Sequence, residues 1–403
     1  MNDNKKLALY GGKPVRDRPL PPMYPGALFI DESEEEAVLE VLRSKSLFRY
    51  YGPMLLHKTE IFEKMFAEYI GVKYSLGVTS GTAALYVALR ALGIGPGDEV
   101  LVPAYTWIST PAMVAVLGAI PVITRIDKSL LIDPNDIRDK ITDKTKAIIP
   151  VHMRGAPCDM NEIMKIAKEY DLKVIEDTAQ ACGGSYRGKK LGSIGDIGTF
   201  SFQLNKIITS GEGGAIVTNN EELYKRAVAT HDVAAYYRNP DYIPPLLGLN
   251  FRMNEVIAAI LIEQLKKINK IIETMRRFKE EIKKGISDIS GIEFRKIHDP
   301  QGDTGICVVF FLPNANKAQE FVRALRAENI RAHVLYNERA LDGHICKYWL
   351  PILKNRVRYD EETINDTLSL LGRAVHIDVS PILTDEDVNT IIEGIHKVAN
   401  SIL

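Results

Sequence analysis

A chain of 403 residues with 51 basic and 52 acidic side chains carries a formal net charge of only −1, and 46% of its residues are hydrophobic. This charge balance excludes a general binder of nucleic acid or of anionic membranes, because both need a strongly basic surface. The length exceeds what one small hydrophobic core requires. The sequence therefore predicts a large domain followed by a smaller one.

The cysteines and the first residues bear on the compartment in which the protein works. Cys158, Cys182, Cys307 and Cys346 are far apart and include no Cys-x-x-Cys pair, so we expect reduced thiols and no bound metal. The start of the chain lacks the apolar core of a signal peptide, and no apolar run is long enough to span a bilayer. The sequence thus predicts a soluble protein of the cytoplasm.

The first 51 residues predict an extended arm followed by a helix. Several prolines lie between residues 14 and 25, and acidic residues at 31–34 precede a helical segment at 35–44. A polar, aromatic loop at 49–52 leads to a second helical segment at 60–71, where Phe62, Met65, Phe66 and Tyr69 share one face.

Beyond these helices, short apolar segments alternate with helical ones. Segments of strand length lie at residues 74–78, 99–103, 120–125, 147–152, 172–175, 199–202 and 215–218. Apolar strands that alternate with helices predict a mainly parallel sheet covered by helices on both faces. In such sheets, ligands bind at the carboxyl ends of the strands.

The first candidate site follows the strand at 74–78. Ser80, Gly81 and Thr82 form a turn between this strand and the helical segment at 83–92. Free backbone N–H groups, hydroxyls and the positive end of the helix dipole meet there, which favours binding of an anion such as phosphate. The alternative is a helix N-cap with no ligand, because a Ser-Gly-Thr turn is common.

The second candidate is Lys206, in the stretch TFSFQLNKIITSGEGG at 199–214. Two predicted strands flank this lysine, and Gly211, Gly213 and Gly214 follow it. A lysine held inside a protein is costly unless it gives up its charge, for instance by forming an imine with a carbonyl cofactor. The alternative is a surface lysine in a hairpin loop.

Several chemistry-bearing residues follow the ends of different predicted strands. Trp107, His152, Asp177 and Gln180 each occupy such a position, as does Lys206. Each alone has an ordinary explanation, such as core packing, a helix cap or a surface charge. Together with the anion-binding turn, however, they suit a phosphorylated, nitrogen-containing aromatic aldehyde. This description fits pyridoxal phosphate.

The remainder of the chain predicts the second domain. Helical spacing of apolar residues begins after 248–255 and continues through a long, charged helix to about residue 286. Strand segments at 292–295, 306–311 and 331–335, with a helix at 318–328, indicate an α+β unit. We therefore divide the chain into a large cofactor-binding domain with an N-terminal arm at 1–270 and a small domain at 271–403.

With these motifs in view, nearly the whole chain resembles the DegT/DnrJ/EryC1/StrS family of sugar and cyclitol aminotransferases. The resemblance rests on TSGTAAL (79–85), GDEVLVPAYTW (97–107), VIEDTAQACGG (174–184), FSFQLNKIITSGEGG (200–214) and GLNFRMNE (248–255). It implies the α/β fold of aspartate aminotransferase-like, pyridoxal phosphate-dependent enzymes. That fold has a mainly parallel seven-stranded sheet in a large domain and a smaller α+β domain.

The resemblance also implies roles for individual residues. Lys206 resembles the lysine that forms the imine and shuttles the proton during transamination, and Asp177 resembles the partner of the pyridine nitrogen. Gln180 corresponds to the residue near the 3-oxygen of the ring, and Trp107 to the residue stacked on its face. The residues implied to hold the phosphate are Ser80, Gly81, Thr82 and Ser201. Asn250 resembles an asparagine that reaches the phosphate from a neighbouring subunit, which implies a homodimer with shared sites.

The resemblance leaves the substrates open. The amino donor it implies is glutamate or glutamine. The opening GGKPVRDRPLP (11–21) resembles aminocyclitol enzymes, whereas VHMRG (151–155) and DPQGD (299–303) resemble the enzyme that forms an 8-amino-octulosonate. Arg154 stands where nucleotide-sugar enzymes usually have an aromatic residue. It is a candidate contact for a substrate carboxylate or for a structural aspartate. Further candidate substrate contacts are Arg49, Tyr51 and His152.

Two alternatives accompany the prediction of an amino-sugar or aminocyclitol aminotransferase. One is a dehydrating or aromatising enzyme of the aminohydroxybenzoate synthase type, which uses the same cofactor and which Lys206 also allows. The other is a regulatory or binding protein that keeps the fold without activity. The presence of Lys206, Asp177 and Ser201 argues against the second alternative.

Overall fold

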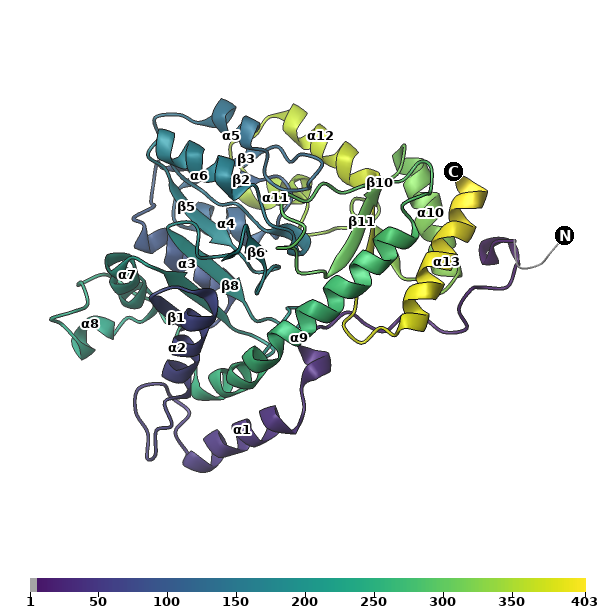
Figure 1. The fold of residues 1–403 in the computed structure, drawn as a ribbon. Coiled ribbons are helices and arrows are strands. Elements are labelled where there is room, and N and C mark those ends of the chain that lie inside the picture. The colour runs from purple at the N-terminus through teal and green to yellow at the C-terminus, as the bar shows by residue number, and fades with distance from the viewer. Residues whose placement is uncertain (1–5) are drawn as a thin grey trace.

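Two sheets organise the molecule (Figure 1). The computed structural model describes residues 6–403; residues 1–5, which the sequence analysis assigned to the arm, lie outside this range. A seven-stranded sheet lies between residues 74 and 218, and a four-stranded sheet lies between residues 293 and 378. A small hairpin of β6 (Ser185–Tyr186) and β7 (Lys189–Lys190) stands apart from both sheets.

The large sheet is mainly parallel, as predicted. Its strands lie in the order β1 (Tyr74–Val78), β9 (Gly214–Thr218), β8 (Ile197–Ser201), β5 (Lys173–Asp177), β4 (Thr145–Ile148), β2 (Glu99–Pro103) and β3 (Ile120–Thr124). Strand β9 runs antiparallel to both of its neighbours, and the other strands all share one direction. The predicted strand at 147–152 is shorter than expected, because β4 ends at Ile148 and Val151 makes only an isolated bridge to Asp177.

Helices cover the large sheet because its strands are apolar on both faces. Helices α3 (Gly81–Ala91), α4 (Ser109–Val116) and α7 (Glu221–His231) pack as one group around α3. Helices α5 (Pro134–Lys140) and α6 (Met160–Glu169) form a second group against β3 and β5. All five residues of β2, β8 and β9 are buried, as this sandwich arrangement requires.

The small sheet is antiparallel, with strands in the order β10 (Glu293–Phe294), β11 (Cys307–Phe311), β13 (Ala374–Asp378) and β12 (Ala332–Val334). The sequence indicated three of these strands but not β13. The helices of this region are α10 (Ala315–Ala327), α11 (Cys346–Leu353), α12 (Glu361–Gly372) and α13 (Asp385–Ile402). Helices α10 and α13 pack against one another beside the sheet (Figure 1).

The 31-residue helix α9 (Glu255–Gly285) connects the two sheets. Figure 1 shows α1 (Glu32–Ser44) and α2 (Lys58–Ile70) at its start, and β11 and α13 at its end. The predicted domain boundary at residue 270 falls inside this helix. The division into 1–270 and 271–403 stays a prediction, and α9 is the element that would link the two parts.

The N-terminal arm runs along the small sheet before it reaches the large one. The Ala8 backbone N–H donates to Glu328 Oε1 at 2.8 Å, and Arg16 pairs with Asp387 at 2.7 Å. Further along, the Gly26 N–H donates to the carbonyl of Lys206 at 3.2 Å. The arm therefore links the C-terminal helices to the loop of the candidate lysine. The remaining short helices are the 3₁₀ turns Ala8–Tyr10, Ala27–Phe29 and Met153–Gly155, and α8 (Ala235–Arg238).

Three further observations concern the described part of the chain. Within residues 6–403 no helix is both long and apolar enough to cross a membrane. The same residues contain no group of three or more histidine, cysteine or acidic side chains arranged to hold a metal ion. All four cysteines are buried and form no disulfide.

Candidate active site

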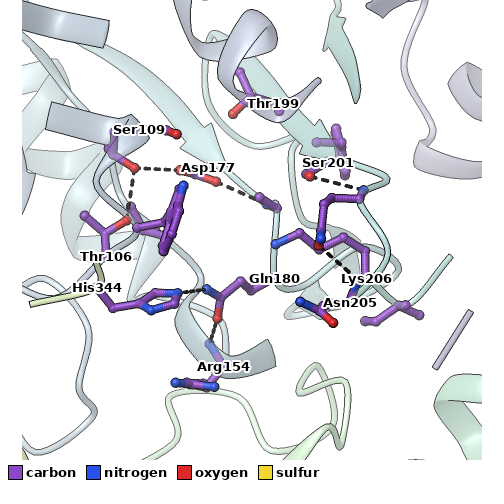
Figure 2. A pocket seen from close by; sticks show the side chains of 18 of the residues that line it. Thr106, Ser109, Arg154, Asp177, Gln180, Thr199, Ser201, Asn205, Lys206 and His344 are labelled. Atoms are coloured by element: carbon purple, nitrogen blue, oxygen red, sulfur yellow. Dashed lines mark hydrogen bonds between the residues drawn. The ribbon is translucent and has the colours of Figure 1, made fainter. Parts of the chain in front are cut away.

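A cavity of about 550 Å³ lies at the carboxyl ends of the parallel strands of the large sheet. The turns after β1, β2, β5 and β8 open into it, which is where ligands bind in sheets of this kind. Figure 2 shows Thr106, Gln180 and Lys206, which follow β2, β5 and β8, around one space. The sequence-predicted site residues that line the cavity are Ser80, Gly81, Thr82, Trp107, Arg154, Asp177, Gln180, Ser201 and Lys206.

The start of helix α3 forms one end of the cavity. Helix α3 begins at Gly81, so its first backbone N–H groups have no acceptor within the helix. Ser80 caps the helix by accepting from the Ala83 N–H at 3.0 Å, and Thr82 Oγ1 lies 2.8 Å from Ser109 Oγ. A Cβ atom at position 81 would come within 2.7 Å of Ser201 Cβ, so only glycine allows this close approach. Backbone N–H groups and hydroxyls gathered in this way suit a phosphate.

Lys206 lies in the loop between β8 and β9 and points into the cavity (Figure 2). Its ammonium makes no hydrogen bond or ion pair with any residue of the described chain 6–403. Burial lowers the pKa of Lys206; the Asp177 charge opposes this effect and the Arg154 charge adds to it. Burial thus favours the neutral amine, which is the form that acts as a nucleophile or a base.

Asp177 is buried at the end of β5, at the base of the cavity. Its carboxylate accepts from Thr110 Oγ1 at 2.9 Å and from the Ala179 N–H at 3.1 Å. Burial raises the pKa of Asp177, whereas these two hydrogen bonds and the charge of Lys206 act to lower it. A cationic ring nitrogen bound beside this carboxylate would favour its ionised form in the same way.

A chain of hydrogen bonds connects the cavity wall to a loop that follows the small-sheet strand β12. His344 Nδ1 lies 2.7 Å from Asp342 Oδ1, and His344 Nε2 lies 3.2 Å from Gln180 Nε2. The oxygen of the Gln180 amide accepts from the Arg154 backbone N–H at 3.1 Å. This arrangement is satisfied when neutral His344 donates to Asp342 and accepts from Gln180. The centroid of the His344 ring also lies 5.0 Å from that of the Trp107 ring. This loop therefore packs against both Gln180 and Trp107, the two residues predicted to contact the cofactor ring.

The sequence analysis missed His344, Asp378 and His376, which also line the cavity. They come from the second half of the chain, more than 130 residues beyond Lys206. No local motif marks them. His376 and Asp378 lie on β13, a mostly buried strand that the sequence analysis did not identify. Recognition of this strand is the signal that could have pointed to these two residues.

Comparisons with known proteins agree with this geometry. The family model of the DegT/DnrJ/EryC1/StrS aminotransferase family matches residues 29–396. This chain belongs to that family. Members of the DegT/DnrJ/EryC1/StrS family are aminotransferases that use pyridoxal phosphate, and the chain is an enzyme of this kind.

Three similar proteins illustrate the range of the family. GDP-perosamine synthase of Caulobacter vibrioides is 41% identical over 64% of this chain and 68% of its own length. An L-glutamine:2-deoxy-scyllo-inosose aminotransferase of Streptoalloteichus tenebrarius is 37% identical over 67% of this chain and 66% of its own length. The crystal structure of an aminotransferase from Psychrobacter cryohalolentis covers 94% of this chain and 100% of its own, with 29% identity and a TM-score of 0.84.

Two residues that were predicted as ligand contacts, Tyr51 and Asn250, do not line the cavity of the single chain. Tyr51 is 71% exposed, in the loop between α1 and α2. Asn250 is also exposed, in the loop before α9, where it bridges Asp232 through the backbone. Both side chains are therefore exposed on the surface of the DegT/DnrJ/EryC1/StrS enzyme.

Two further predicted contacts, Arg49 and His152, are held by buried carboxylates and do not line the cavity. Arg49 Nη2 lies 3.0 Å from both oxygens of Glu63. His152 is fully buried, accepts from the Cys158 N–H at Nδ1 and lies 3.1 Å from Glu176 at Nε2. Each of these side chains thus has a carboxylate partner within the chain, and their role as substrate contacts stays a prediction.

Glu176 offers a stability test that is separate from the chemistry. It precedes Asp177 on β5 and faces the opposite side of the sheet, because side chains alternate along a strand. Besides His152, its carboxylate accepts from the N–H groups of Gly192, Ile194 and Gly195 at 2.6–2.9 Å. Glu176→Gln leaves buried donors without an acceptor, so we expect a loss of about 2–4 kcal/mol in the free energy of unfolding.

Urea unfolding of the Glu176→Gln variant measures this loss. Glu393→Gln, at an exposed position of α13, is the matched control and should change the free energy by less than about 0.5 kcal/mol. Equal stability of the two variants would show that the hydrogen bonds from residues 192–195 to Glu176 do not stabilise the fold.

Proposed function

We propose that this enzyme transfers an amino group from glutamate or glutamine to a keto or aldehydo group of a sugar or cyclitol. The observation that carries the proposal is a cavity that brings an unpaired lysine, a buried carboxylate and a glycine-hydroxyl turn to one strand edge. The named activities of the similar proteins, which act on a nucleotide-linked sugar or a keto-cyclitol, support this acceptor class.

The residues of the cavity fit pyridoxal phosphate. When bound, the cofactor supplies an aldehyde that takes up the amino group and a ring that accepts electrons. Lys206 is the residue that bonds to the aldehyde, and Asp177 is the counter-charge to the ring nitrogen. The turn at 80–82 and Ser201 bind the phosphate, and Trp107 and Gln180 contact the ring.

Lys206 also moves the proton in the proposed reaction. When free of the cofactor, Lys206 Nζ would accept a proton from the α-carbon of the donor and would return it to the carbon that carried the cofactor's aldehyde, two bonds away. Burial lowers the pKa of Lys206 and so favours the neutral amine, the form that the first of these steps requires. Enclosure of the cavity by the N-terminal arm at Met23 and Pro25 limits the access of water.

We further propose that the active unit is a homodimer in which Asn250 completes the phosphate site of the neighbouring subunit. Asn250 is exposed and lies outside its own cavity. Large apolar side chains surround it on the same surface: Val233 is 56% exposed, Leu247 78% and Leu249 44%. Apolar groups exposed together favour burial against another protein surface.

The absorbance spectrum of the purified protein, supplied with pyridoxal phosphate, tests the proposed function. We expect a band at about 410–430 nm from the bond to Lys206, and loss of this band on addition of L-glutamate or L-glutamine. Return of the band with a keto-sugar or keto-cyclitol then identifies the acceptor class. A band that no amino acid donor removes would contradict the aminotransferase half-reaction.

A further inference from the structure

The Arg154 guanidinium lines the cavity without an acidic partner. Its Nε donates to Tyr105 Oη at 3.1 Å, which leaves the two terminal nitrogens, Nη1 and Nη2. None of the ion pairs within residues 6–403 involves Arg154. By contrast, Arg49 and Arg16 are both buried against a carboxylate, at 3.0 Å and 2.7 Å. A guanidinium withdrawn from water is costly unless an anion accompanies it.

The backbone at Arg154 adopts an unfavourable conformation that directs the side chain into the cavity. Arg154 has φ +54° and Gly155 has φ +77°, so two consecutive residues are left-handed. A side chain at Gly155 would meet Thr304 Oγ1 at 2.1 Å, which excludes other residues there. A left-handed arginine costs about 1–2 kcal/mol, and strain of this kind persists where the surrounding structure imposes it.

The surroundings of Arg154 impose this conformation from three sides. Its N–H donates to Gln180, its carbonyl accepts from Cys307 Sγ at 3.6 Å, and its side chain is held by Tyr105. Figure 2 shows Arg154 beside Gln180, on the side of the cavity away from Thr199. The guanidinium is therefore a fixed group, prepared before any ligand arrives.

Arg154 also acts electrostatically on the reacting lysine. Its charge is one of the influences that lower the pKa of Lys206. Burial raises the pKa of Asp378 on β13, and the Arg154 charge opposes this effect. Asp378 also lines the cavity, yet among residues 6–403 it pairs with His376, at 3.5 Å, and not with Arg154. An anion bound to Arg154 thus lies within the electrostatic range of Lys206 Nζ.

We infer that Arg154 binds a carboxylate group of a substrate through Nη1 and Nη2, while Tyr105 fixes its Nε. A planar carboxylate matches the two parallel N–H groups of a guanidinium. This inference rests on the proposed function and adds to it a recognition group for one substrate. The carboxylate has two sources, the amino acid donor or an acidic sugar acceptor, and the same experiment separates them.

The experiment compares Arg154→Gln and Arg154→Lys with a matched control, Arg187→Gln. Arg187 is also left-handed, at φ +49°, and also precedes a left-handed glycine, but it is exposed and outside the cavity. Retention of the absorbance band and of the thermal unfolding midpoint first shows that each variant folds and holds the cofactor. Absence of the band in the wild type would instead count against the proposed function.

Calorimetric titration with two unreactive probes then measures carboxylate binding. Glutarate has the carbon skeleton of the donor, and glucuronate is a sugar acid. We expect Arg154→Gln to weaken binding of one probe by about 10-fold or more, Arg154→Lys to weaken it less, and Arg187→Gln to leave it unchanged. Loss for glutarate assigns the site to the donor, and loss for glucuronate assigns it to the acceptor.

Two results would overturn the inference. The first is that neither probe binds the wild-type holoenzyme, or that Arg154→Gln binds both as well as the wild type does. The second concerns Asp378. If Arg154 only neutralises the charge of this aspartate and does not contact the probe, Asp378→Asn should weaken probe binding as much as Arg154→Gln does. The inference predicts equal or tighter binding instead, because the substitution removes a negative charge near the bound carboxylate.

Discussion

Lys206→Ala is expected to abolish amino transfer and to remove the absorbance band at about 410–430 nm from the holoenzyme. Loss of the proton-transferring amine alone is expected to cost about 10²–10⁴-fold in rate, and loss of the bond to the cofactor adds to this. The fold should be little affected, because Lys206 makes no hydrogen bond through its side chain with the described part of the chain. Removal of a half-buried amine that has no hydrogen-bond partner among residues 6–403 can even stabilise the protein.

The decisive measurement is the absorbance spectrum of Lys206→Ala after addition of pyridoxal phosphate, together with single-turnover rates with L-glutamate and L-glutamine. Lys189→Ala is the matched control, because Lys189 is an exposed lysine of the β6–β7 hairpin. The control should retain both band and rate. Persistence of the band in Lys206→Ala would mean that another lysine bonds to the cofactor.

Asp177→Asn is expected to lower the rate of the donor half-reaction by about 10²–10³-fold while the cofactor band is retained. Asparagine keeps the shape of the side chain and can still accept one hydrogen bond from Thr110 or Ala179. It has no negative charge, however, so it cannot hold the ring nitrogen in its protonated form. The defect should therefore appear in the chemical step rather than in binding.

Stopped-flow loss of the band at saturating donor concentration isolates this step. Thr110→Val is a useful comparison, because it removes one hydrogen bond to Asp177 and leaves the charge in place. We expect a smaller effect, of about 10-fold. Wild-type rates for Asp177→Asn would exclude Asp177 as the partner of the ring nitrogen.

Much of the large sheet was predictable because its strands are apolar on both faces and alternate with helices. The strands at 74–78 and 99–103 agree with the prediction at both ends. The strand at 147–152 was overestimated because Ile149, Pro150 and Val151 are as apolar as a strand, although the chain turns there toward Arg154. The local composition does not show where a buried segment stops forming hydrogen bonds with the neighbouring strand.

The candidate site was predictable where strand ends carry unusual residues. The turn at 80–82, Asp177 and Lys206 meet in one cavity, as the strand-end rule requires. His344 and Asp378 were missed because only tertiary packing brings them there. Arg49, which the sequence suggested as a substrate contact, pairs with Glu63 from α2 and does not line the cavity. A sequence shows that an arginine is present, yet not whether a carboxylate elsewhere in the chain neutralises it.

The origin of the cavity wall has a consequence for how this enzyme can diversify. The lysine, the carboxylate and the anion-binding turn precede residue 215, whereas His344, His376 and Asp378 are contributed by the chain beyond α9. Recombination between related genes with a crossover inside α9 would exchange the second group and leave the first intact. Such exchanges would alter one wall of the cavity and leave the residues at the strand ends of the large sheet unchanged.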